Sequence, residues 1–201
     1  MALTTVARGG LSSGALPALI PISSTTVTGS SVTDITIDNL PTTYDSYEFI
    51  LMFHPTSDGP ILYAKFIRND GDVIENAHAD YANPYTWHFM SDGTSYQDNY
   101  DPQMELGYGT GSASNEGIRA TLRLTGRNYS GQTDSNQTAP HLFGHHIEFR
   151  TNGLVTGGAQ YAGLDIYQNA SDATVRGIKF YFSAGDIGTS STVSVFGIQH
   201  P

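Results

Sequence analysis

The sequence contains no cysteine among its 201 residues. Disulfide bonds, thiolate zinc sites and cysteine nucleophiles are therefore excluded together. The absence of cysteine also excludes a disulfide-rich secreted scaffold. A chain of this length buries roughly 70% of its unfolded surface on folding, so a single domain can form a core without covalent cross-links.

Charge is the second scarce property. Charged residues make up 14% of the chain, against about 25% in an average protein. Nine Lys and Arg face nineteen Asp and Glu, which gives a net charge of −10. Nucleic acids and anionic membrane surfaces require clustered positive charge, so we predict neither as a partner. No long apolar run occurs, so no membrane insertion is predicted.

The N-terminal 30 residues lack aromatic side chains and carry one charge, Arg8. Their apolar stretch is interrupted by Gly14, Pro17 and Pro21, whereas a secretory signal needs an unbroken apolar core. The two prolines also disfavour a regular helix or a central strand. We therefore predict that residues 1–30 form an extended arm without a signal peptide.

The arm is too apolar for a solvated tail. Its aliphatic side chains should be buried either against a neighbouring subunit or against the chain's own domain. The candidates for docking are Leu16, Leu19, Ile20 and Ile22.

The residues that are abundant point to β-structure. Twenty-two glycines and twelve tyrosines favour strands joined by tight turns. A polar surface made of Ser, Thr, Asn and Gln is untypical of helices, whose exposed faces favour Glu, Lys and Ala. We therefore predict an all-β protein.

Strand periodicity appears from Val32 onward. Residues 47–53 are apolar on both faces, which indicates either a central strand of a sandwich or a strand at a subunit contact. Residues 117–124 alternate, and four of them are predicted to face inward: Ile118, Ala120, Leu122 and Leu124. Further candidate strands cover residues 32–38, 60–68, 141–150, 163–167, 175–182 and 192–198. This series predicts a jelly-roll-like antiparallel β-sandwich over residues 31–201.

Residues 75–110 show no regular period and are predicted to form a long loop rich in aromatic residues. Tyr and Trp supply large contact area at low entropic cost. The aromatic candidates for partner binding are Tyr85, Trp87, Tyr96 and Tyr100. The alternative is that their rings cover one end of the sandwich.

No residue pattern indicates catalysis or metal binding. Adjacent His145 and His146 face opposite sides of a strand, and His141 is too far along it to share an ion with His145. Residues 69–75 fit a hairpin turn better than a calcium loop. A sugar-cleaving site needs paired carboxylates. The aromatic stretch contains Asp98, Asp101 and Glu105, but nothing distinguishes these three from the other acidic residues of the chain. We predict no metal, no cofactor and no enzymatic activity.

Two segments resemble parts of tailed-bacteriophage virion proteins. Residues 182–198 end in Val-Phe-Gly-Ile, similar to a terminal strand that finishes in a hydrophobic-Tyr/Phe-Gly-Ile signature. Residues 40–51, Leu-Pro-Thr-Thr-Tyr-Asp-Ser-Tyr-Glu-Phe-Ile-Leu, look like the matching start, in which a Pro and a Tyr lead into a buried strand. The turn Arg-Asn-Asp-Gly at residues 68–71 is similar to the R-F-N-G turn of that pattern, with an extra Asp.

The resemblance implies β-sandwich domains of tail-fibre proteins, other tail proteins and capsid-decorating proteins, typically homotrimers. From it we expect a capsid decoration or cement protein that is assembled in the host cytoplasm and located in the virion. Its expected partners are copies of itself and other virion proteins, such as the major capsid protein. The alternative is a tail-fibre or receptor-binding protein that contacts host surface glycans.

Overall fold

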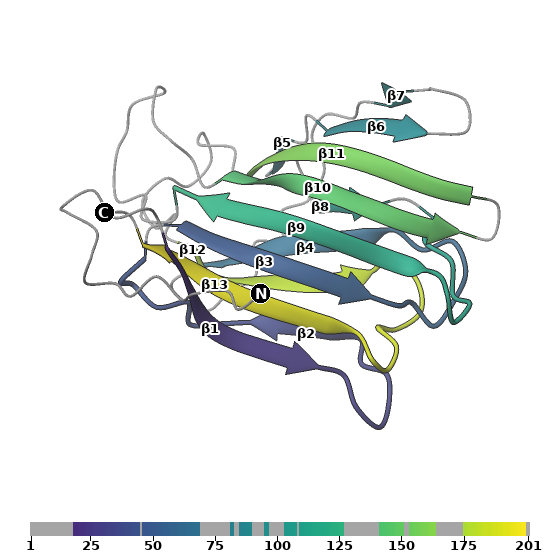
Figure 1. The fold of residues 1–201 in the computed structure, drawn as a ribbon, viewed down its shortest axis with the longest axis horizontal. Coiled ribbons are helices and arrows are strands. Elements are labelled where there is room, and N and C mark those ends of the chain that lie inside the picture. Colours follow the sequence, from purple (N-terminus) through teal and green to yellow (C-terminus); the bar gives the residue numbers. More distant parts are fainter. Residues whose placement is uncertain are drawn as a thin grey trace, which may run out of the picture.

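The computed structural model describes residues 18–44, 46–68, 81–82, 85–89, 95–96, 103–107, 109–126, 141–150, 153–163 and 175–199. Throughout this part of the chain the regular elements are β-strands, paired antiparallel in two sheets that pack face to face (Figure 1). The prediction of an all-β antiparallel sandwich is confirmed. A jelly-roll connection between the strands stays a prediction.

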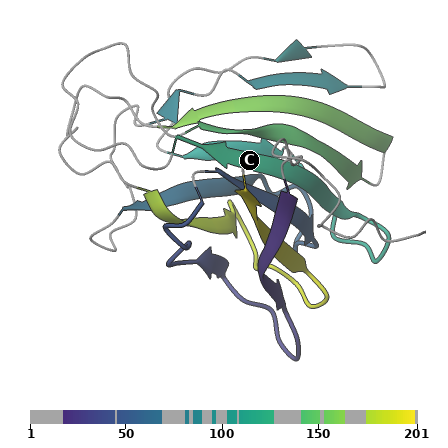
Figure 2. The same ribbon diagram turned by 60° about the vertical axis from the view of Figure 1, so that its left-hand side comes forward.

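The larger sheet contains nine strands. Its order is β1 (Ala18–Thr26), β13 (Thr192–Gln199), β3 (Ser46–Phe53), β9 (Gly117–Thr125), β10 (His141–Arg150), β11 (Gly153–Gly163), β6 (Tyr85–Phe89) and β7 (Ser95–Tyr96), with β5 (Tyr81–Ala82) also paired to β11. The smaller sheet has the order β2 (Asp34–Ile37), β12 (Val175–Phe182), β4 (Leu62–Arg68) and β8 (Met104–Gly107). In the turned view, β11 and β6 continue the larger sheet past the smaller one (Figure 2).

The core lies between the two sheets and is centred on β3. The inward side chains of this strand, Phe49 and Phe53 among them, are fully buried. Both rings meet Phe180 of β12 edge to face, with centroids 6.1 and 5.9 Å apart. Edge-to-face contacts add about 0.5–1.5 kcal/mol each to the burial of the rings, so these pairs join the sheets at their centre.

The alternation predicted for residues 117–124 is confirmed in β9. Ile118, Ala120, Leu122 and Leu124 are buried, whereas Arg119 and Arg123 are exposed. Of the two alternatives for residues 47–53, the central strand is confirmed, because β3 pairs with β13 on one side and β9 on the other; a subunit contact stays a prediction.

From residue 18 onward the predicted arm lies against the chain's own domain, which is the second of the two alternatives given for it. Residues 18–26 form β1, which pairs with β13 of the same chain. Pro21 is compatible with this strand because β1 lies at the sheet edge, where proline is tolerated, and the register shifts between Pro21 and Ser23. Contact between the arm and a neighbouring subunit stays a prediction.

The predicted aromatic loop is wrong as a single irregular segment. Within residues 75–110 the chain forms β5, β6, β7 and β8. Sequence reasoning did not predict β11, which begins at Gly153 and ends at Gly163, and the predicted strand at residues 163–167 lies beyond Gly163 outside the described residues. β5 to β8 are two to five residues long, too short for a strand period to stand out in the sequence. β11 is rich in Gly, so its state is fixed by pairing with its neighbours and not by intrinsic preference.

The two segments that carry the family resemblance meet in space. Tyr47 of β3 is in register with Gly197 of β13, and a Cβ placed on Gly197 would lie 2.5 Å from the Tyr44 ring. The Tyr47 hydroxyl is within hydrogen-bond distance of the Pro41 and Tyr44 carbonyl oxygens. The Pro-Thr-Thr-Tyr segment is thereby fixed over the terminal strand, and Gly197 leaves room for the Tyr44 ring.

Candidate interaction surfaces

The outer face of the larger sheet is the surface directed away from the core. Strand pairing aligns its side chains in rows across β3, β9 and β10. One row contains Ile50, Thr121 and His145. The two flanking rows place Phe143 beside Arg123, and Ile147 beside Arg119.

This face is unusually apolar for a surface in water. Five large hydrophobic side chains are classed as exposed in the described part of the chain, and four of them lie on this face: Leu19 (47%), Ile50 (43%), Phe143 (37%) and Ile147 (37%). A sheet with one solvated face normally alternates between apolar inward and polar outward residues. The outward rows of β3 and β10 break that rule, and exposed apolar patches mark contact sites.

The charges on this face are few and mixed. On β1, β13, β3, β9 and β10 the outward carboxylate and guanidinium side chains are Glu48, Arg119 and Arg123, and His141 and His145 of β10 are exposed on the same face. Arg123 donates to Glu48 at 3.2 Å, and the Arg119 guanidinium lies 5.7 Å from the Phe149 ring centroid. In a chain of net charge −10, this face is therefore not acidic.

The outer face of the smaller sheet has a different character. The chain has only two lysines, and Lys65 of β4 and Lys179 of β12 stand directly opposite each other there. Like charges in that arrangement are destabilising. Tyr181 follows in the next row of the same face, with its ring centroid 5.7 Å from the Lys65 ammonium nitrogen and 5.9 Å from that of Lys179. The Asp34 carboxylate lies 3.4 Å from the Lys179 ammonium.

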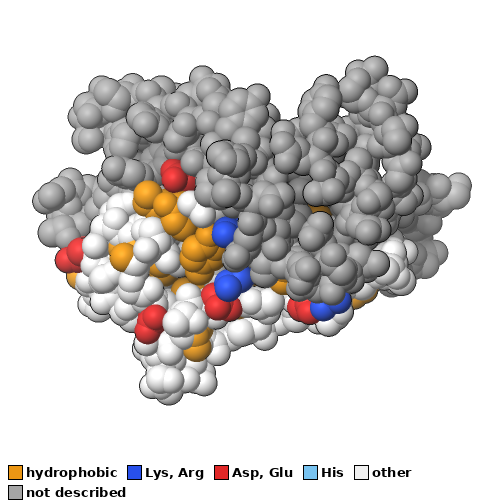
Figure 3. Space-filling model, turned by 180° about the vertical axis from the view of Figure 1, so that it is seen from behind, with side chains coloured by type: hydrophobic (Ala, Val, Ile, Leu, Met, Phe, Trp, Pro, Cys, Tyr) orange, Lys and Arg blue, Asp and Glu red, His pale blue; other side chains and the backbone are white. Residues whose placement is uncertain are grey.

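Tyr63 completes this cluster, with its ring centroid 5.5 Å from that of Tyr181. The Tyr181 hydroxyl donates to Gln103 at 3.1 Å. Seen from behind, hydrophobic side chains gather over the smaller sheet with basic and acidic groups beside them (Figure 3). This surface, the tyrosine–lysine cluster, combines aromatic rings with ammonium groups.

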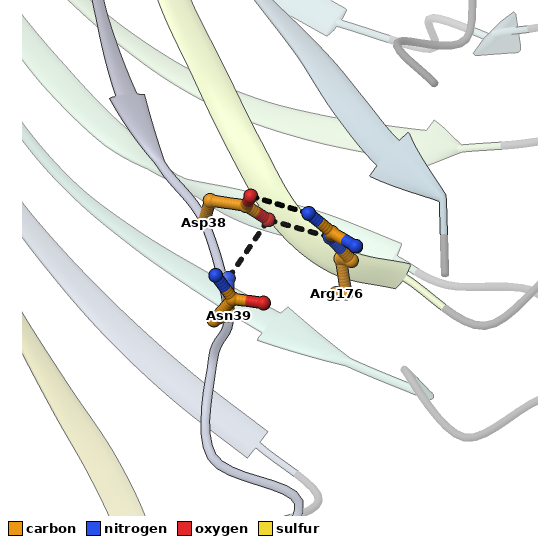
Figure 4. A network of polar contacts seen from close by, with 3 residues as sticks. All are labelled: Asp38, Asn39 and Arg176. Carbon is orange, nitrogen blue, oxygen red and sulfur yellow. Dashed lines mark hydrogen bonds and ion pairs between the residues drawn. The ribbon is translucent and has the colours of Figure 1, made fainter. Parts of the chain in front are cut away.

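An ion pair closes one end of the same sheet. Arg176 Nε and Nη2 donate to the two carboxylate oxygens of Asp38 at 2.7 and 2.5 Å (Figure 4). The hydrogen bond from Arg176, supported by one from the Asn39 N–H, lowers the pKa of Asp38. Asn39 has a φ of 57°, which Asn tolerates better than most residues. The pair fixes the end of β2 against the start of β12.

A buried acid–histidine pair is the feature that sequence reasoning missed. His146 and Glu148 of β10 both point inward and are buried, with Nε2 and Oε1 4.0 Å apart. Gly107 of β8 leaves room for the carboxylate, because a Cβ there would come within 2.0 Å of Glu148 Oε1. The prediction that His145 and His146 face opposite sides is confirmed, since His145 is exposed. The i, i+2 spacing of His146 and Glu148 on a strand was the available signal.

The structure assigns the predicted partner-binding residues to different places. Leu19 is exposed on β1, whereas Ile20 and Ile22 of that strand are half-buried, and Ile22 packs against the core. Pairing of β6 with β7 brings Trp87 opposite Tyr96, and pairs Tyr85 of β6 with Ala159 of β11. Leu16 and Tyr100 lie outside the described residues, as do Asp98, Asp101 and the turn at residues 69–75.

Among the residues that the structure describes, no group of three or more His, Asp or Glu side chains is placed to hold a metal ion. No helix in the described ranges has the length and apolarity needed to cross a membrane. In comparisons with protein families, curated proteins and solved structures, the chain gave no match.

Proposed function

We propose that the chain is a structural protein of a bacteriophage virion, a capsid decoration or cement protein that stabilises the shell through subunit contacts. In this proposal it is not an enzyme and carries no cofactor. The observation that carries the proposal is the apolar outer face of the larger sheet, where Ile50 of β3 and Phe143 and Ile147 of β10 are exposed on either side of β9.

The physical basis of such a function is the burial of apolar area at repeated contacts. Each Å² removed from water contributes about 25 cal/mol, and in a shell the same contact recurs in many copies. The resemblance of residues 40–51 and 182–198 to virion proteins supports this role. These segments pack together through Tyr44, Tyr47 and Gly197, as a motif with two interdependent parts would require.

Counting the copies in purified particles tests the proposal. Quantitative mass spectrometry should find this chain in an amount comparable to the major shell subunit. Absence from the particle would contradict the proposed function. A small copy number would instead assign the chain to the tail.

The N-terminal arm can be tested separately. A variant that lacks residues 1–17 keeps all of β1, which begins at Ala18, so the described sandwich should still fold. We expect this variant to lose incorporation into particles. Normal incorporation would show that the arm does not anchor the chain.

The alternative function is a tail-fibre or receptor-binding protein that contacts host polysaccharide. The observation that favours it is the tyrosine–lysine cluster, because aromatic rings and ammonium groups suit acidic sugars. A glycan array discriminates between the two functions. Binding that is lost in Lys65→Ala and Lys179→Ala would favour the tail protein, and no binding is expected of a decoration protein.

A further inference from the structure

We propose that the outer face of the larger sheet is a twofold contact between two copies of this chain, packed sheet against sheet. The inference rests on the proposed function in one respect, that the outer face is a protein contact. It adds the identity of the partner, a second copy of this chain. Flat antiparallel sheets pack on each other about 10 Å apart with their strands within about 30°, as they do inside a sandwich.

The apolar content of the face supports a dry contact. Ile50 occupies the middle row on β3, and Phe143 and Ile147 flank that row on β10. Half-buried Met52 and Phe196 extend the apolar surface on β3 and β13. Thr121, Arg119 and Arg123 of β9 lie between the apolar side chains of β3 and β10, so long and short side chains alternate across the surface, as interdigitation of two copies requires.

The size of the face is at the lower limit for a specific protein contact. The five adjacent strands from β1 to β10 in the sheet order span about 19 Å at the usual strand spacing. A strand of eight residues, such as β3, is about 27 Å long. Two copies of the resulting face, roughly 520 Å² each, together reach the about 1,000 Å² that a specific interface should exceed.

The charges of the face permit a second copy, because both signs are present on it. Two chains of net charge −10 repel each other at most surfaces. The strands that define this face instead carry one acidic side chain, Glu48, and two basic ones, Arg119 and Arg123. Arg119 forms no ion pair among the described residues, where its neighbour is the Phe149 ring. In a twofold contact Arg119 can reach Glu48 of the second copy, so the face is self-complementary.

Sedimentation equilibrium of the full chain at micromolar concentrations tests the proposal. We expect twice the chain mass. Ile50→Lys and Phe143→Lys should each raise the dissociation constant at least about a hundredfold. Each substituted side chain weakens the contact about tenfold, and in a twofold contact it is present once on each copy, so the two effects multiply. Circular dichroism checks folding. If either lysine variant is unfolded, the milder Ile50→Thr and Ile147→Thr should still raise the dissociation constant at least about tenfold.

Val32→Lys is the matched control. Val32 is 37% exposed, as Phe143 and Ile147 are, but it lies between β1 and β2 and outside the outer face. This variant should remain a dimer. A monomeric wild type, a closed trimer, face variants that still dimerise, or dissociation of the Val32→Lys control would each overturn the contact.

The test separates this contact from the proposed function. A monomer that is abundant in particles would refute the contact and leave the function standing. A dimer that is absent from particles would refute the function and leave the contact standing.

Discussion

Glycine 197 shows how one residue couples two distant segments. A Cβ at this position would meet the base of the Tyr44 ring, at 2.5 Å from Cδ2 and 2.6 Å from Cγ. An added methyl group would therefore force the Tyr44 ring to turn about χ1 or the chain to shift. The close approach joins the segment before β3 to the last strand of the sheet.

Gly197→Ala should therefore destabilise the protein by about 1–3 kcal/mol, the usual cost of overpacking a fitted site. Urea unfolding measures the change. The same substitution should cost distinctly less in a Tyr44→Ala background, because the ring that it meets has been removed. An equal cost in both backgrounds would show that the Tyr44 ring does not impose the glycine.

The Asp38–Arg176 pair gives the stability of the protein a pH dependence. The pKa of Asp38 is lowered in the folded state from its ordinary value of 3.8. A lowered folded-state pKa means that the pair contributes stability above the unfolded pKa, and that this contribution is lost as the pH falls through the folded pKa. Because the pair is partly exposed, we expect at most about 1 kcal/mol.

A double-mutant cycle with Asp38→Asn and Arg176→Gln measures this coupling. Urea unfolding at neutral pH should give a positive coupling energy, and unfolding well below pH 3.8 should give almost none. Coupling that persists in acid would mean that the carboxylate charge is not the source of the interaction.

At the scale of the element, β1 is the strand whose role the structure changes. It protects one edge of the larger sheet, and its own outer edge carries features that discourage further pairing, namely Pro21, an adjacent register shift and the exposed polar residues 23–26. Natural sheets use proline and bulges in this way at their edges. β1 is thus part of the domain that the arm was expected only to precede.

Deletion of residues 1–26 should have a much larger effect than deletion of residues 1–17. Removal of β1 exposes the edge of β13 and takes Ile20 and Ile22 from their half-buried positions. We expect the unfolding free energy to fall by about 2 kcal/mol or more, which urea unfolding measures. We also expect aggregation, which light scattering measures. Equal stability of the two truncated chains would show that β1 adds nothing to the sandwich.

β11 is a strand because of its pairing with neighbouring strands and not because of its own residue preferences. Its sequence, Gly-Leu-Val-Thr-Gly-Gly-Ala-Gln-Tyr-Ala-Gly, has little intrinsic strand preference, since glycine weakens strands. The strand nevertheless pairs with β10 over residues 153–162 and with β6 over residues 155–159. Backbone hydrogen bonds to strongly alternating neighbours hold this segment in place.

At the scale of the molecule, the two outer faces of the sandwich have different chemistry. The larger sheet presents aliphatic and phenylalanine side chains with a few mixed charges, whereas the smaller sheet presents tyrosines, both lysines and ion pairs. A contact with a second copy suits the first face, and a polar ligand suits the second. This asymmetry is the physical ground for assigning the two faces to different partners.

Much of the fold follows from sequence alone. The all-β class came from composition, because a surface of Ser, Thr, Gly and Tyr with few charges is unsuited to helices. Residues 117–124 and 47–53 were placed correctly, since strict alternation, or a strand apolar on both faces, leaves few alternatives once one side must be buried. These are local properties, and local properties can be read along the chain.

Other features depended on the tertiary structure. Pairing decided that residues 18–26 belong to the sheet and that β11 is a strand, and stacking decided that Gly197 must lack a side chain. The exposed outer face could not be found from sequence, because Ile50 and Phe49 are both apolar and only the position of the second sheet determines which of them is covered. A residue's chemistry is fixed by the sequence, but its partner across the sheet or core is fixed by the fold.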